Sequence, residues 1–154
     1  MLSLFPTIKK MTIFLSLSFV YMLGQAQDAQ PDSWKITWNK KIILHSSTSN
    51  EAANVRKIKS ADLNKNYILQ ISYKEADVKK EKDWIRSFTF FDETDNEITR
   101  KDSTRKVKIA AAELKKMFGD KKMVKIYTVA IPSDPNLAAR VRVRRLHLCT
   151  LVVE

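Results

Sequence analysis

The sequence predicts an all-β fold, an antiparallel β-sandwich of jelly-roll or Ig-like type, with seven to nine strands and one short helix near residues 110–118. Three observations favour this fold. Apolar and polar residues alternate in one segment after another, which is the period of a half-buried strand. Only one stretch is rich in helix formers. The 154 residues include one Cys and two Gly, so a single domain must be held by its core rather than by disulfides.

In the first half of the chain, strands are predicted where this alternation is clear. Trp34–Trp38 has two indoles and an isoleucine on one face, and Tyr67–Tyr73 has two tyrosines, a leucine and an isoleucine on one face. Lys41–His45 is another short strand. Val55–Lys59 is a weaker one, because its apolar residues depart from strict alternation. Lys74–Asp83 has many charges and one large apolar residue, which predicts a solvated loop.

In the second half, the aromatic strand Trp84–Phe91 and the segment Glu97–Arg100 flank Asp92–Asn96, whose Asx chemistry predicts a hairpin turn. Helix formers fill Ala110–Phe118, and Gly119 follows where a glycine commonly ends a helix. The remaining predicted strands are Thr104–Ile109, Met123–Ile131 and the long Arg140–Val153.

Residues 1–26 have the pattern of a secretory signal peptide. Lys9 and Lys10 precede the apolar run Met11–Leu23, which is shorter than the roughly 20 residues of a membrane-spanning helix. The small residues Gly24 and Ala26 suit cleavage after Ala26. A buried N-terminal helix and an uncleaved anchor are the alternatives to this interpretation.

The expected mature protein has a flexible lead-in at residues 27–33 and one sandwich domain at residues 34–154. No cysteine follows the cleavage site, so the bacterial lipoprotein pattern is absent. We therefore expect a periplasmic or secreted protein that is not a lipoprotein and has no transmembrane span after signal removal.

Positive charge is the unusual feature of the composition, with a formal net charge of +11. Residues 27–98 hold 12 basic and 12 acidic side chains, whereas residues 99–154 hold 14 basic and 5 acidic ones. The excess therefore lies in the C-terminal third. Basic charge often indicates a nucleic-acid partner, but export argues against nucleic acid as the physiological one.

Arg140, Arg142 and Arg144 form the strongest local signal. In a strand they would lie on one face about 7 Å apart, and a guanidinium matches carboxylate, sulfate or phosphate groups bidentately. This row predicts an anion-binding site. The competing interpretation is a solvated sheet face on which these arginines pair with acids of the neighbouring strand.

The alternation changes phase after this row. Arg145 and His147 fall in phase with the valines of the row, whereas Leu146 and Leu148 fall in phase with its arginines. Either a β-bulge at Arg144–Arg145 resets the phase, or the second half of the strand is buried on both faces and Arg145 and His147 need partners. We favour the bulge.

Trp34, Trp38 and Trp84 could form a sugar-stacking platform, as in sandwich carbohydrate-binding modules. The core interpretation competes with this one and is favoured, because Trp34 and Trp38 share the apolar face of Ile36.

The other candidate residues favour structural roles. His45 and His147 are too few for a metal site without recruited carboxylates, so we predict no metal ligand. Asp92, Asp95, Asn96 and Glu97 resemble a calcium loop in composition but lack its spacing, which favours a hairpin turn. Cys149 lies among apolar residues and is predicted to be buried.

No nucleophile, phosphate-cradle or metalloprotease motif occurs, so no cofactor and no catalytic residue is predicted. We expect an exported, non-catalytic binding or interaction domain of the bacterial envelope or secretome, with an envelope or extracellular protein as partner. The alternative is binding of an anionic glycan or other polyanion through the arginine row. A hydrolase with paired carboxylates is a third hypothesis.

Overall fold

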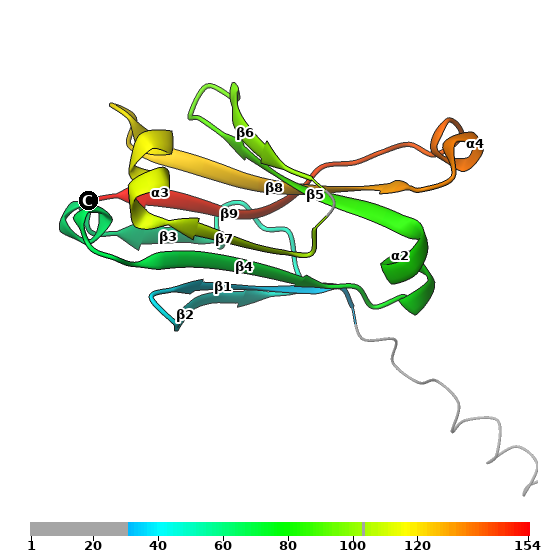
Figure 1. The fold of residues 1–154 in the computed structure, drawn as a ribbon, viewed down its shortest axis with the longest axis horizontal. Helices are drawn as coiled ribbons and strands as arrows, with labels where there is room; N and C mark the ends of the chain where they lie inside the picture. Colours follow the sequence, from blue (N-terminus) through cyan, green and yellow to red (C-terminus); the bar gives the residue numbers. More distant parts are fainter. Residues whose placement is uncertain (1–30, 103) are drawn as a thin grey trace, which may run out of the picture. The chain divides into compact units, whose positions relative to one another are not determined.

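The described residues form two β-sheets of four and five strands (Figure 1). The computed structural model describes residues 31–102 and 104–154, without the side chains of Val78, Lys79 and Glu81. The predicted signal peptide and the first part of the lead-in lie outside the described residues. The four-stranded sheet has the order β2-β1-β4-β7, and the five-stranded sheet has the order β3-β9-β8-β5-β6.

The strands follow the predicted segments closely. In chain order they are β1 (Ser33–Trp38), β2 (Lys41–Ser46), β3 (Val55–Ile58), β4 (Ile68–Lys74), β5 (Trp84–Phe91), β6 (Glu97–Lys101), β7 (Lys106–Ala110), β8 (Met123–Pro132) and β9 (Leu146–Val153). The prediction of seven to nine strands in two sheets is confirmed for the described residues. The C-terminal strand begins six residues later than expected.

Helical segments occur only on connections. They are the 3-10 turn η1 (Ser60–Asn64), α2 (Val78–Asp83), α3 (Ala111–Phe118) and α4 (Pro135–Ala138). The helix predicted near residues 110–118 is confirmed as α3, and Gly119 at its end has a φ of 56°, in the left-handed region that glycine adopts without strain. The segment expected to be a charged loop contains α2, where charged residues with good helix propensity form a short turn.

The core lies between the inner faces of the two sheets. β1 and β4 contribute alternate residues such as Trp34, Ile36 and Leu69, and β5 contributes Phe88 and Phe90, all at most 2% exposed. Among the described residues the core extends from Trp34 to Leu151, and residues 31–154 form one compact unit.

One hydrogen bond from the core joins the sheets directly. The indole Nε1–H of Trp34 in β1 donates to the carbonyl of Leu148 in β9 at 3.0 Å. Because a buried N–H without a partner is costly, this bond fixes the orientation of Trp34 as a core residue.

Strand direction departs from the prediction at one edge. Every paired strand in the described residues is antiparallel to its neighbour except β3, which runs parallel to β9. The purely antiparallel prediction is wrong here. β3 and β9 are far apart in the chain, so no short hairpin constrains their relative direction.

The bulge in the C-terminal strand lies at Leu148 and not at Arg144–Arg145. Ile126 of β8 is opposite Cys149, and the next residue of β8, Tyr127, is opposite His147, which leaves Leu148 as the extra residue. As a result β9 is buried on both faces from His147 to Leu151. The favoured position of the bulge was therefore wrong, and the alternative of a doubly buried strand is correct.

Only one ring nitrogen of His147 has a hydrogen-bond partner among the described residues. Its Nε2 lies 3.0 Å from the Oγ1 of Thr150, while its Nδ1 is buried and has no hydrogen-bond partner among the described residues. The ring packs edge-on against Tyr127. Burial lowers the pKa of His147 below its ordinary value of 6.5, because a protonated ring would place an unpaired N–H in the interior.

We expect acid to weaken the fold through His147 below about pH 6.5. The unfolded chain binds this proton first, so the contribution of His147 to stability is complete above its unfolded pKa of 6.5 and decreases as the pH falls toward the lower folded pKa. Urea denaturation between about pH 7.5 and pH 5 measures the loss. His147→Gln should remove it, and His45→Gln, at an exposed strand position, should retain it. An unchanged pH dependence in His147→Gln would contradict this account.

Candidate functional site

The segment that contains the arginine row is not part of a strand. β9 begins at Leu146, opposite Thr128 of β8, and Arg140–Arg145 form a turn, a bend and extended chain without strand pairing. The prediction of three arginines on one strand face is therefore wrong. A longer β9 would have brought an arginine of this dense run to the inner face of the sandwich, where an unpaired charge is costly.

Two of the three arginines nevertheless lie together. Arg142 and Arg144 line a groove of about 310 Å³, whose lining also includes residues of α2 and β8. Arg140 does not line it. Figure 1 shows α2 and α4 at the same end of the sandwich. A hydrogen bond from the Ser133 hydroxyl to the Asp83 carbonyl, 2.8 Å long, ties the two connections of this end together. The remaining lining residues of this arginine groove are Tyr73, Lys80, Trp84, Arg86, Thr128, Ala130, Val143 and Leu146.

Arg145 anchors the arginine segment to the five-stranded sheet. Its guanidinium carbon lies 4.7 Å from the ring centroid of Phe91 and 4.6 Å from that of Tyr127. Such cation–π contacts hold the side chain flat against the two rings. Three of the four neighbouring arginines therefore divide by role: Arg145 packs on two aromatic rings, whereas Arg142 and Arg144 are exposed at the groove.

Arg86, which lines the groove, belongs to a buried ion pair, and we call this pair the floor of the groove. Arg86 of β5 donates from Nε and Nη2 to the two carboxylate oxygens of Glu75, at 2.7 and 3.0 Å. Its Nη1 donates to the Oγ1 of Thr128 in β8 at 3.0 Å. The Arg86 and Glu75 side chains are 6% and 0% exposed. Glu75 directly follows β4, so this bidentate pair connects the two sheets.

Aromatic rings stack below this ion pair. The guanidinium of Arg86 lies 3.6 Å from the ring centroid of Tyr73, which in turn stacks parallel to Trp34. Burial raises the pKa of Tyr73 above its ordinary range, an effect that the nearby Arg86 opposes. The Tyr73 hydroxyl therefore stays protonated and donates to the carboxylate of Asp32 at 2.8 Å.

Arg105 fixes the side of the groove formed by α2. Its Nη2 donates to the carbonyls of Lys80 and Trp84, at 3.0 and 2.9 Å, and its Nε lies 3.7 Å from Glu75. The single buried carboxylate of Glu75 thus faces two guanidinium groups. The groove keeps a net positive charge, because none of the ion pairs found in the described part of the chain involves Lys80, Arg142 or Arg144.

The three tryptophans do not form one exposed platform. Trp34 and Trp38 are buried in the core, as the core interpretation expected. Trp84 is half-buried in the groove, with the Lys80 ammonium 5.6 Å from its ring centroid. One indole of the three is therefore placed beside the predicted arginines, where an aromatic surface and cations could contact the same ligand.

The other candidate residues have structural surroundings. Asp92 accepts hydrogen bonds from the backbone N–H of Thr94 and Asn96 and forms an ion pair with Lys121, which lowers the pKa of its carboxyl. This is the predicted hairpin turn. Cys149 is buried, which raises its thiol pKa to about 12. Within the described residues, no group of three His, Cys, Asp or Glu side chains is placed to hold a metal ion.

Three residues of the groove were predicted from the sequence, but the buried ion pair at its floor was not. Arg142, Arg144 and Trp84 were candidates, whereas Arg86 and Glu75 were not. A single arginine inside the aromatic run of β5 was the available signal, since a charged residue at an inward strand position needs a buried partner. The identity of that partner depends on the sheet arrangement.

Comparisons with protein-family models and with curated proteins find no match to this sequence. Among the described residues, no helix is long and apolar enough to span a membrane.

Breaking the buried ion pair should destabilise the domain strongly. Glu75→Gln leaves the Arg86 charge in the interior with a weaker partner, and we expect a loss of about 3–5 kcal/mol in the free energy of unfolding. The double replacement Arg86→Met and Glu75→Leu removes both charges and should cost less than either single change. The exposed pair of Lys57 and Glu154 offers a control, since Lys57→Gln should change stability by about 0–1 kcal/mol. Urea denaturation measures these three variants and the single replacements Arg86→Met and Glu75→Leu, and strictly additive losses in the double variant would contradict the coupling.

Proposed function

We propose that this protein is an exported, non-catalytic binding domain of the bacterial envelope or secretome, and that its ligand is an anionic glycan or similar polyanion held in the arginine groove. The observation that supports this most directly is the exposure of Arg142 and Arg144 without an ion-pair partner among the described residues, beside a half-buried Trp84. Guanidinium groups bind carboxylate and sulfate groups bidentately. An indole beside them offers a flat surface for a sugar ring.

The floor of the groove supports the same ligand class. Arg86 is hydrogen-bonded to both Glu75 and Thr128, which holds its side chain in place. A preorganised site loses less entropy on binding. The extended arginine segment above this floor provides exposed side chains that adjust to a polymer.

Three hollows in the described residues have basic linings, which supports binding of an anion. The arginine groove and two further hollows on the outer face of the four-stranded sheet have no Asp or Glu in their linings. Paired carboxylates, which a glycosidase needs on either side of the scissile bond, therefore have no place in them. We propose no catalytic residue, cofactor or metal.

A protein partner is the second candidate and would use a free sheet edge. β2, β7, β3 and β6 are the edge strands of the two sheets. Each of them contains Lys or Arg, and charged side chains on an edge oppose the addition of a further strand. The edges therefore favour this candidate less than the groove favours an anionic ligand. The finer fold proposal, a jelly-roll or Ig-like sandwich, rests on the two sheets of four and five strands.

The test is binding of polygalacturonate and dextran sulfate, with uncharged dextran as control ligand. We expect the double variant Arg142→Gln and Arg144→Gln to bind about thirtyfold more weakly, because each of the two lost charge-assisted contacts contributes on the order of 1 kcal/mol at an exposed site. Added salt should weaken binding of the unmodified chain by screening. Isothermal titration calorimetry measures both effects.

The matched control replaces Arg140 and Lys59 with Gln, which removes the same charge from exposed positions outside the groove. It should bind like the unmodified chain. Equal weakening in the control and the groove variant would show that net charge, not the groove, determines binding. Absence of binding to either polyanion would reject the proposed ligand class.

A further inference from the structure

The outer face of the four-stranded sheet is a second basic surface, separate from the arginine groove. The four strands of this sheet contain no Asp or Glu. Their outward positions and the turn after β1 contribute the exposed side chains of Lys35, Lys40, Lys74, Lys106 and Lys108, which together we call the lysine face. Positive charge is therefore present on this face without a negative residue in its own strands.

These lysines have no acidic partners from elsewhere in the described residues. Other lysines do: Lys57, Lys65, Lys101, Lys121 and Lys125 each form an ion pair with a carboxylate. None of the lysine-face residues takes part in such a pair. Like charges gathered on one surface repel each other, so this arrangement is unfavourable for the isolated domain and is relieved by an anionic partner.

Strand register spaces the cations regularly across the face. In one row, Ser72 of β4 lies opposite Lys106 of β7 on one side and Lys35 of β1 on the other. The two lysines are therefore separated by two strand spacings, about 10 Å. In the adjacent row, Gln70 of β4 lies opposite Lys108 of β7 on one side and Thr37 of β1 on the other. A neutral side chain thus lies between the two lysines of the first row, whereas Lys106 and Lys108 are direct neighbours on one face of β7.

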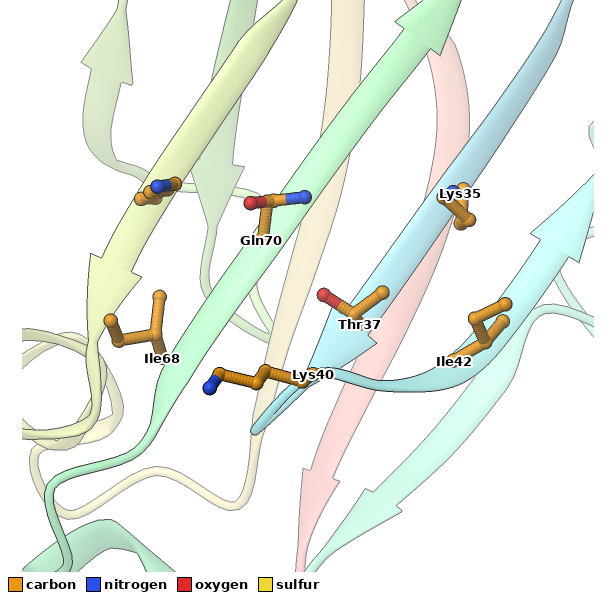
Figure 2. A pocket seen from close by; sticks show the side chains of 7 residues that line it. Lys35, Thr37, Lys40, Ile42, Ile68 and Gln70 are labelled. Atoms are coloured by element: carbon orange, nitrogen blue, oxygen red, sulfur yellow. The ribbon is translucent and has the colours of Figure 1, made fainter.

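Apolar side chains stand on the same face. Ile42 is 56% exposed and Ile68 is 45% exposed. Figure 2 shows them on opposite sides of Thr37 and Lys40, with Lys35 and Gln70 further along the strands. Together with Lys108 these residues line a hollow of about 410 Å³. The face therefore presents two protruding isoleucines surrounded by ammonium groups and two neutral polar side chains.

We infer that the lysine face docks on a membrane leaflet that contains anionic phospholipid. Lysine ammonium groups are compact point charges on long apolar stems, which suit the diffuse negative charge of a lipid surface. The two exposed isoleucines gain apolar contact only if their partner has an apolar layer beneath its charged surface, as a leaflet has. A soluble acidic polymer would satisfy the lysines and leave the isoleucines exposed.

This site is independent of the proposed polyanion ligand. No residue of the hollow between Ile42 and Ile68 lines the arginine groove, and the two surfaces differ in charged group, lysine against arginine. Docking through the lysine face would leave the groove at the end of the sandwich open to a ligand. The two proposals can therefore fail separately.

The test is cosedimentation of the chain from Gln27 to Glu154 with two vesicle types, pure phosphatidylcholine and phosphatidylcholine with about 30% phosphatidylglycerol. This chain contains the whole compact unit and lacks the apolar run Met11–Leu23, which would itself bind lipid. We expect binding to the anionic vesicles only. Circular dichroism and thermal melting confirm that each variant folds.

Two double variants test the two parts of the face. Lys35→Gln with Lys108→Gln should weaken binding to anionic vesicles by roughly tenfold to thirtyfold. Ile42→Ser with Ile68→Ser should weaken it about tenfold without changing net charge. The matched control Lys59→Gln with Lys116→Gln removes two exposed charges from other surfaces and should bind like the unmodified chain.

Three results would overturn the inference. They are equal binding to both vesicle types, equal loss in the control and the lysine variant, and unchanged vesicle binding after replacement of the isoleucines. The last result would show that the isoleucines make no apolar contact with the leaflet. The variant Arg142→Gln with Arg144→Gln should keep its vesicle binding, so failure of the polyanion proposal and failure of this one give different results.

Discussion

The buried ion pair between Glu75 and Arg86 is the interaction on which the end of the sandwich with the arginine groove depends. Glu75 follows β4 of one sheet and Arg86 lies in β5 of the other, and both side chains are almost wholly excluded from solvent. A charge at this depth is tolerated only when its hydrogen bonds are satisfied, and here Thr128 and the Tyr73 ring complete the surroundings of Arg86. The pair closes the apolar core at this end and forms the floor of the arginine groove. This single polar contact therefore involves the core, both sheets and the arginine groove.

The positive charge of the domain is divided between two surfaces of different chemistry. The groove combines guanidinium groups, which form directed bidentate contacts, with the ring of Trp84. The lysine face combines point charges with exposed isoleucines on the outer side of a sheet. Acidic side chains are used mainly elsewhere: Asp92 and Glu113 pair with lysines near the hairpin and α3, and Glu75 is enclosed by Arg86 and Arg105. This distribution leaves both basic surfaces open to anionic partners.

The strands were predictable because alternation is a local property. β1, β4 and β5 agree with the sequence to within a residue, and Gly119 ends α3 as expected. The exception is the segment before β9, where valines alternating with arginines imitate a strand although the pairing with β8 ends at Leu146. The candidate site, like the strands, was predicted only where its residues form a local pattern. Arg142, Arg144 and Trp84 were visible as local patterns, whereas Glu75 and Arg86 form a pair only after the two sheets have come together.

The sequence by itself determined the all-β class, the position of nearly every strand, the burial of Trp34 and Cys149, and the basic character of the C-terminal third. Each of these follows from neighbouring residues, through the two-residue period of a strand or through simple charge. The tertiary structure alone decided the parallel pairing of β3 with β9, the bulge at Leu148 and the existence of the lysine face. The lysines of that face lie in a turn and in strands far apart in the chain, and the region before residue 99 appears neutral in sequence. Sheet order places these lysines on one surface and leaves the acidic side chains on other surfaces. The sequence does not reveal this arrangement, because strand register depends on contacts between residues distant in the chain.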